Sequence, residues 1–275
     1  MKTKFKNKFK RMYLFVFLII ACFSVTAQES GYLVNRIKPG DICYRDTEGH
    51  EQFVDYRQWD QANPPGTALG VVFFSYYGTR PCGIEGVEKA WHGWIVSVDQ
   101  NDTCIFAPVT SICYDTCVAL YPVEGINTPY NPAELPSSLC VADTCGWQST
   151  KRLLEFIYTG CGAVLSDETL PALRYIFSEK NGINDFSQKP PMTADSWYLM
   201  GYGQLRILYG YLGPVNAAMA ACGGALFSVE TWYTSTEVSY RYPKSVWSYG
   251  HDGTNCTTAG WFKDKGRVVR AVRSF

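Results

Sequence analysis

The chain of 275 residues is long enough for one large domain or two small ones, and its 25 basic and 25 acidic residues give a formal net charge of zero. Six basic and no acidic residues lie within the first 27 positions, so the remainder carries 19 basic against 25 acidic residues, a net charge of −6. This acidic balance excludes nucleic acid as a partner, because its phosphates call for Lys and Arg patches.

The start of the chain, residues 1–27, has the features of a signal peptide. Five lysines and one arginine precede an apolar run over 12–23 that is too short to span a bilayer. Val25 and Ala27 occupy the small-residue positions of a cleavage site. A second interpretation is a lipobox, IIAC, in which Cys22 carries a lipid anchor. Both predict export to the periplasm, the outer cell surface or the medium.

Ten cysteines follow Cys22, an even and high count. In an exported chain this favours disulfides, although several of them could equally be small buried apolar residues. The CxxxC and CxxxxC spacings are not those of a zinc site, and no histidine lies close enough to complete one, so no metal is expected. The ten are Cys43, Cys82, Cys104, Cys113, Cys117, Cys140, Cys145, Cys161, Cys222 and Cys256.

Residues 28–275 are expected to form a single domain whose first part, about 28–145, is rich in strands. Short strands are predicted at GDICYRD and QFVDY. Longer ones are predicted at Ala68–Tyr77, which is apolar and β-branched, and at His92–Gln100, which alternates. Residues 101–145 are rich in Pro, Asp, Thr and Cys, and we expect long loops held by disulfides.

Helices are predicted next. The sequence STKRLLEFIYTG carries an apolar stripe, with Ser149 or Thr150 as N-cap. SDETLPALRYIFSEKNG ends at Gly182, which suits the left-handed position after a helix. GYGQLRILYGYLG and VNAAMAACGG predict a pair of short helices broken at Gly213-Pro214.

After Gly224 the pattern returns to strands, at TWYTST, SVWSYG and GRVVRAVRSF. The last of these ends at Phe275 with no polar tail. Because termini fray unless they are tied down, we expect this apolar strand to be paired inside a sheet. Strands, then helices, then strands predict an α+β domain whose two ends meet in one sheet.

Four segments of the C-terminal part, about 146–275, match in order the motifs of one bacterial family: Ser196–Gly224, Trp232–Glu237, Val246–Gly253 and Val268–Phe275. Through them this part resembles the domain at the C-terminus of the collagen-like adhesin Lcl. Met200 replaces that family's usual proline, and Gln204 replaces its usual glutamate.

The resemblance implies a C-type-lectin-like fold with a mixed or antiparallel sheet and several short helices. The variable proteins of diversity-generating retroelements are similar. In those proteins a rigid scaffold presents a segment rich in Tyr, Asn, Ser and Arg just before a terminal V-R strand, and that segment binds the receptor. Residues 240–255 lie in the matching place.

Side-chain chemistry divides the aromatic residues of this region into two groups. Trp232, Tyr233 and Trp247 lie within predicted strands and are expected in the core. Pro243 removes a ladder donor and marks a loop, whose Tyr and Arg side chains would suit a recognition surface. An ordinary solvated loop is the alternative. The predicted ligand-contact residues are Tyr240, Arg241, Tyr242, Lys244, Tyr249, His251, Asp252 and Asn255.

Catalysis and calcium-dependent sugar binding have little support. The three histidines are His50, His92 and His251, and no GxSxG, HExxH, P-loop or dinucleotide motif occurs. His92 is expected to be structural, and the neighbours His251 and Asp252 would point opposite ways in a strand. The paired cysteines of formylglycine-generating enzymes, which share the lectin-like fold, cannot be placed here. The EPN, QPD and WND motifs of calcium lectins are absent, so no cofactor is expected.

The sequence therefore predicts an exported module that binds a cell-surface protein or polysaccharide through a Tyr- and Arg-rich face. The alternative is a structural cell-surface or pilus-associated component without a dedicated ligand. A lectin-fold enzyme of the formylglycine-generating type ranks behind both. A membrane would be involved only through a lipid on Cys22.

Overall fold

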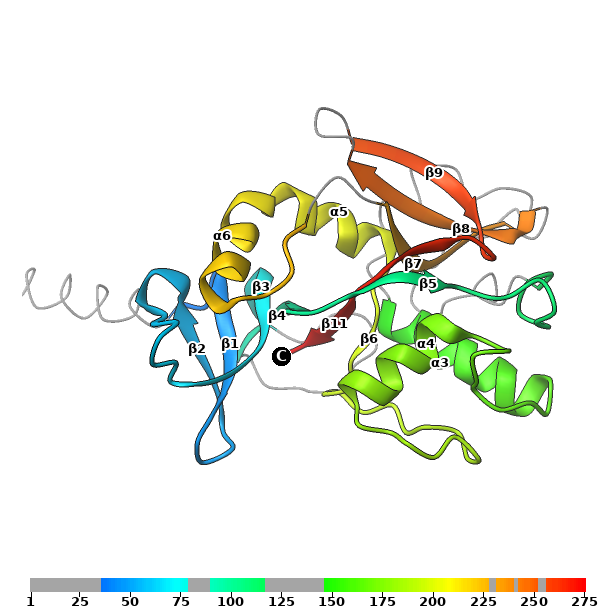
Figure 1. Ribbon diagram of the computed structural model, residues 1–275, viewed down its shortest axis with the longest axis horizontal. Coiled ribbons are helices and arrows are strands. Elements are labelled where there is room, and N and C mark those ends of the chain that lie inside the picture. Colours follow the sequence, from blue (N-terminus) through cyan, green and yellow to red (C-terminus); the bar gives the residue numbers. More distant parts are fainter. Residues whose placement is uncertain (1–35, 79–89, 117–145, 228–230, 240–241, 252–255) are drawn as a thin grey trace, which may run out of the picture. The chain divides into compact units, whose positions relative to one another are not determined.

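The computed structural model describes residues 36–78, 90–116, 146–227, 231–239, 242–251 and 256–275 (Figure 1). The chain divides into two units, Met1–Ile37 and Lys38–Phe275. The predicted signal peptide and Cys22 lie outside the described residues. The second unit combines two sheets with helices and is α+β, as predicted.

A six-stranded sheet contains both ends of the second unit. Its order is β2-β1-β3-β4-β11-β6, and every neighbouring pair is antiparallel. The last strand lies between β4 and β6, which confirms that the final apolar segment is paired inside a sheet shared with the first strand. The strands are β1 (Asp41–Asp46), β2 (Glu51–Asp55), β3 (Gly66–Gly78), β4 (Ala90–Ser97), β6 (Tyr198–Leu199) and β11 (Ala271–Ser274).

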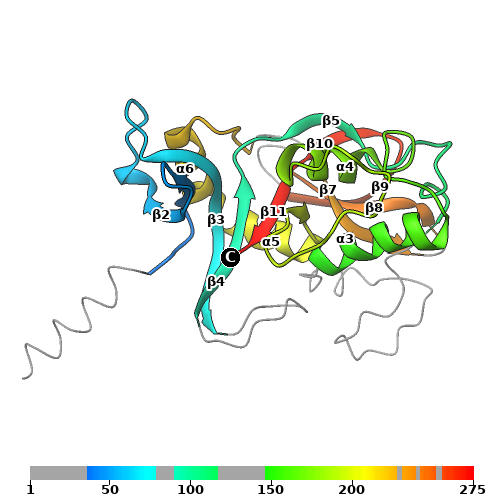
Figure 2. The same cartoon turned by 90° about the horizontal axis from the view of Figure 1, so that it is seen from below.

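A five-stranded sheet has the order β5-β10-β7-β8-β9. β4 leads into β5, and β10 leads into β11, so two neighbouring stretches of chain pass side by side from one sheet to the other (Figures 1 and 2). The β10–β7 pair is parallel. The strands are β5 (Asn101–Ile105), β7 (Thr231–Ser239), β8 (Tyr242–His251), β9 (Cys256–Phe262) and β10 (Gly266–Val269).

Two pairs of helices contact the sheets. α6 packs against β1 and β3, and α5 contacts β3, β7 and β8. α3 contacts β6 and β7, whereas α4 contacts β5 and β6. The helices are α3 (Gly146–Glu155), α4 (Pro171–Tyr175), α5 (Tyr202–Gly210) and α6 (Leu212–Cys222); π-helical turns at Phe156–Gly160 and Ile176–Lys180 extend α3 and α4, and a 3-10 turn spans Tyr56–Gln58.

The main core lies between α5–α6 and one face of the six-stranded sheet. Alternate residues of β3, Val71 and Phe73, are fully buried and face Leu205 and Met219 of the helices in the same cluster. Burying side chains of this size stabilises the fold by about 1.5–3 kcal/mol each. The apolar, β-branched run predicted β3, and the alternating pattern predicted β4, for this reason.

The other face of the same sheet uses glycine to admit large rings. A Cβ on Gly93 would lie 2.0 Å from the carbonyl oxygen of Phe74 and 2.7 Å from Cζ of Phe275. A Cβ on Gly70 would lie 3.2 Å from the indole of Trp197. These two rings therefore cover strand positions that only glycine can occupy without displacing them.

Some predicted boundaries were wrong. α3 begins at Gly146, so Ser149 and Thr150 lie inside the helix and are not caps; both are buried, and the Thr150 hydroxyl accepts the Leu199 backbone N–H at 3.1 Å. The break between α5 and α6 falls at Tyr211, and Gly213-Pro214 lies in the first turn of α6, where a proline costs no helical hydrogen bond.

Two further expectations have opposite outcomes. Residues 101–105 were expected in a loop but form β5. Their polar side chains give them a low strand propensity, and backbone pairing with β10 outweighs it. Gly182 has a φ of 68°, which confirms the left-handed position predicted for it.

Candidate functional site

The predicted ligand-contact residues fall on or beside the β7–β8–β9 part of the five-stranded sheet. Tyr242 pairs with Ser239, so the connection between β7 and β8 consists of two residues. Tyr249 stands opposite Trp232 on one side and Thr258 on the other, and His251 ends β8 opposite Cys256. The strands thus bring Tyr242, Tyr249 and His251 onto one element, β8.

The loop predicted around Pro243 is a strand. Tyr242, Pro243 and Lys244 begin β8, so the expectation that they belong to a loop was wrong. A proline can occupy the first positions of a strand, where a missing N–H costs least. Tyr240, Arg241, Asp252 and Asn255 lie outside the described residues, as do the side chains of Tyr242, Tyr249 and His251.

Lys244 is the predicted contact residue whose side chain the structure describes. Its side chain is half exposed, with Nζ 3.2 Å from the Asp115 carboxylate and 5.4 Å from the centre of the Tyr114 ring. An exposed pair of this kind contributes at most about 1 kcal/mol. Lys244 is therefore available at the surface, close to the segment that follows β5.

The core expectation holds for the two aromatic residues of β7. Trp232 and Tyr233 are fully buried. Trp232 packs against Phe227, with ring centres 5.3 Å apart, and the Tyr233 hydroxyl donates to the Phe262 carbonyl at 2.8 Å. Trp247 lies in β8, with its side chain outside the described part.

Lys263 follows β9 and is a buried cation that sequence reasoning missed. Its Nζ donates to the carbonyls of Cys113 and Thr116 at 2.9 and 2.8 Å, and it lies 5.6 Å from the centre of the Phe106 ring. These bonds fix the segment after β5 beside the end of β9. The local sequence gave no signal, because the acceptors are main-chain atoms about 150 positions away.

Arg273 of β11 is a second buried cation. Its guanidinium makes a bidentate pair with Glu51 of β2, at 2.7 and 2.5 Å, and lies 5.2 Å from the centre of the Trp197 ring. The Phe275 ring packs 4.7 Å from that of Phe53, also in β2. β2 and β11 are separated by three strands in the sheet order, so these contacts close the curved sheet across its face.

Arg270 occupies the junction between β10 and β11. It is fully buried, its guanidinium lies 4.0 Å from the centre of the Phe227 ring, and it donates to the Ala225 carbonyl at 2.9 Å. It also donates to Gln100, which lies at the other passage between the sheets, between β4 and β5. The V-R-A-V-R segment therefore supplies two buried cations: Arg270 at the junction between the sheets and Arg273 within the six-stranded sheet.

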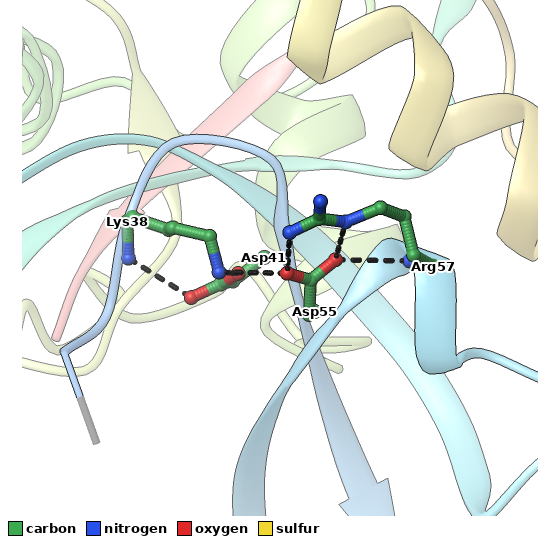
Figure 3. Close-up of polar contacts among 4 residues, drawn as sticks. All are labelled: Lys38, Asp41, Asp55 and Arg57. Atoms are coloured by element: carbon green, nitrogen blue, oxygen red, sulfur yellow. Dashed lines mark hydrogen bonds and ion pairs between the residues drawn. The ribbon is translucent and has the colours of Figure 1, made fainter. Parts of the chain in front are cut away.

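A cluster of charged residues marks the start of the second unit (Figure 3). The Asp55 carboxylate accepts Nζ of Lys38 at 2.8 Å and a bidentate pair from Arg57 at 2.9 and 2.6 Å. Asp41 accepts both the backbone N–H and Nζ of Lys38, at 2.9 and 3.1 Å. The bonds from Arg57 and Lys38 hold the pKa of Asp55 well below its ordinary value of 3.8. The cluster anchors Lys38, the first residue of this unit.

The described thiols do not support a disulfide-held fold. Cys43, Cys104, Cys161 and Cys222 are free, and burial raises the pKa of Cys43 and of Cys104 to about 12. Cys43 and Cys104 behave as small buried apolar residues, the alternative that the sequence left open. Cys82, Cys117, Cys140 and Cys145 lie outside the described residues.

The described residues bring together little that suits catalysis. His92 is buried with Nδ1 3.3 Å from the main-chain oxygen of Phe275, a structural position, and His50 lies on the surface near Glu48. No three His, Cys, Asp or Glu among these residues gather closely enough to bind a metal ion. No helix in the described ranges is long and apolar enough to cross a bilayer.

Comparison with known proteins gives one structural likeness. The structure matches the crystal structure of a fimbrial protein from Bacteroides ovatus ATCC 8483 with a TM-score of 0.56 and 14% identity, over 86% of this chain and 48% of that one. The chain thus has the fold of about half of that protein. No family model and no curated protein matches.

This likeness overturns the resemblance to the Lcl C-terminal domain, to retroelement variable proteins and to the C-type-lectin-like fold. The motifs that suggested it are packing positions here: Trp232, Val246, Val268 and Val272 are all buried. Aromatic and β-branched residues at such spacings serve the core of many α+β sheets, so they do not distinguish one such fold from another.

Proposed function

We propose that the protein is a structural component of the cell surface that is associated with fimbriae. The observation that carries the proposal is the fold shared with about half of a fimbrial protein, over 86% of this chain. The predicted signal peptide gives independent support, because such a component must be exported. A lipid on Cys22 would provide its membrane attachment.

The way the described residues are used also favours a structural role over catalysis. The charged side chains that are most deeply buried, Arg270, Arg273 and Lys263, bind partners within the fold and hold sheets and segments together. Charged side chains that take part in catalysis usually line a cleft that a substrate can enter. The proposed role therefore involves no turnover.

Shearing of the native cells tests this role. Surface appendages are removed mechanically and sedimented, and the protein is followed by immunoblotting beside a periplasmic marker. We expect it in the appendage fraction and, on intact cells, accessible to added protease. Retention of the protein with the periplasmic marker would contradict the proposal.

Ligand contact through the β7–β8 hairpin is a second candidate function. It is favoured by the half-exposed side chain of Lys244 near the start of β8 and by the antiparallel pairing of β7 with β8, in which Tyr242 stands opposite Ser239. Replacement of Tyr240, Arg241 and Tyr242 by alanine, followed by a cell-adhesion assay and a protein and glycan array, tests it. Unchanged binding would contradict ligand contact through this hairpin, and the structural role would be the remaining proposal.

A further inference from the structure

The strand β9 forms one edge of the five-stranded sheet among the described strands, since it pairs with β8 and has no described strand beyond it. Its sequence, CTTAGWF over Cys256–Phe262, contains no charged residue and no proline. Natural sheets protect their edges with charges, prolines, bulges or very short strands. None of these protections occurs in this seven-residue strand.

The other described edges are different. β2 carries Glu51 and Asp55, whose carboxylates are engaged with arginines, and β6 has two residues. β5 includes Asp102 and is contacted by α4. Among the edges formed by described strands, β9 is therefore the one that offers a run of backbone donors and acceptors without a charge, proline or bulge of its own against pairing.

The order of residues in β9 favours a second copy of the same strand as the partner. In an antiparallel pair centred on Ala259, Cys256 stands opposite Phe262, Thr257 opposite Trp261, and Thr258 opposite Gly260. Each large ring then meets a small or β-branched residue, a favourable cross-strand combination, and no charges oppose each other. A parallel pair in register would place Trp261 against Trp261 and Phe262 against Phe262.

We infer that two copies of the chain associate through antiparallel pairing of β9 about a two-fold axis near Ala259. Such an interface is isologous, because each copy supplies the same residues, and it joins two five-stranded sheets into one. It also places two β8 strands, each with Tyr249 and His251, on the same continuous sheet. The inference does not depend on the fimbrial role, since it concerns the isolated chain.

The test is the mass of the purified protein by light scattering or sedimentation, from about 1 µM to about 1 mM, the range in which small interfaces dissociate. We expect a monomer–dimer equilibrium. Ala259→Lys places two ammonium groups opposite each other and should raise the dissociation constant at least about tenfold. Thr103→Lys, an exposed position on β5, is the matched control and should leave it unchanged.

The two-fold register gives a sharper outcome. Ala259→Glu alone should also dissociate, whereas a mixture of Ala259→Lys and Ala259→Glu should form a heterodimer, because opposite charges then meet. In the unaltered protein, the amides of β9 should exchange more slowly as the concentration rises, a readout that needs no variant. A monomer at every concentration, a dimer insensitive to Ala259→Lys, or failure of the mixture to associate would overturn the inference.

Discussion

Replacement of Glu51 by glutamine probes the contact that closes the six-stranded sheet. Arg273 has a side chain 7% exposed and depends on both carboxylate oxygens of Glu51, at 2.7 and 2.5 Å. Breaking a fully buried ion pair costs about 3–5 kcal/mol. Because the Glu51 side chain remains one-third exposed, water can replace part of the loss, and we expect about 2 kcal/mol. For a unit of this size that lowers Tm by about 4–8 °C.

The pH dependence of this loss follows from the pKa of Glu51. The hydrogen bonds from Arg273 lower that pKa below its ordinary value of 4.5 in the folded protein. The stabilisation is therefore complete above the unfolded pKa and is lost as the pH falls through the lower folded pKa. The difference in unfolding free energy between the unaltered protein and Glu51→Gln should be constant near neutral pH and shrink in acid.

Urea unfolding at several pH values measures both effects. Glu48→Gln is the matched control, because Glu48 is 78% exposed and should change the free energy of unfolding little. Equal stability of Glu51→Gln and the unaltered protein at pH 7, or a difference that persists unchanged in acid, would refute the reasoning.

Three further predictions concern other parts of the fold. Gly93→Ala should lower the free energy of unfolding in urea by at least about 3 kcal/mol, because the added Cβ would meet a carbonyl oxygen at 2.0 Å. Gly210→Ala, with open space around it, should be neutral or stabilising. Equal effects of the two substitutions would contradict the packing around Gly93. Lys263→Met should lower the free energy of unfolding by about 2 kcal/mol, because it removes two hydrogen bonds to carbonyls. Lys265 is exposed, so Lys265→Met is the control; an equal loss of stability in the two variants would argue against the anchoring role of Lys263. The thiols of Cys43 and Cys104 should react with a maleimide only on unfolding, since a pKa of about 12 leaves little thiolate; rapid labelling of the folded protein would contradict their burial.

The sequence predicted those elements whose buried residues form a recognisable local pattern. β3 is a continuous apolar and β-branched run, β4 follows an alternating pattern, and the apolar last strand required a place inside a sheet. β9 was missed because CTTAGWF lacks both alternation and a run of β-branched apolar residues. Its pairing with β8 is a long-range property.

The buried cations could not be predicted, because their partners are distant in the chain. Arg273 and Glu51 are 222 positions apart, and Arg270 and Gln100 are 170 apart. The same arginines contributed to the resemblance with a lectin-like family, since a V-R-x-V-R segment has no local feature that separates a buried structural role from other roles. Of the candidate contact residues, Tyr249 was correctly predicted to lie in a strand, which is β8. Tyr242 and Lys244 were wrongly predicted to lie in a loop, because Pro243 was taken to interrupt the strand.

Native-state hydrogen exchange on β11 tests the account most directly, because both the shared fold and the closed sheet require this strand between β4 and β6. Because Phe275 and Gly93 exchange both of their backbone hydrogen bonds, the alternating ladder makes Arg273 and Ile95 the next hydrogen-bonded pair of β11 and β4. We predict that the amides of Arg273 and Ile95 exchange only through global unfolding, with a free energy equal to that from urea denaturation. Exchange of these amides by local fraying, at a free energy far below the global value, would contradict it.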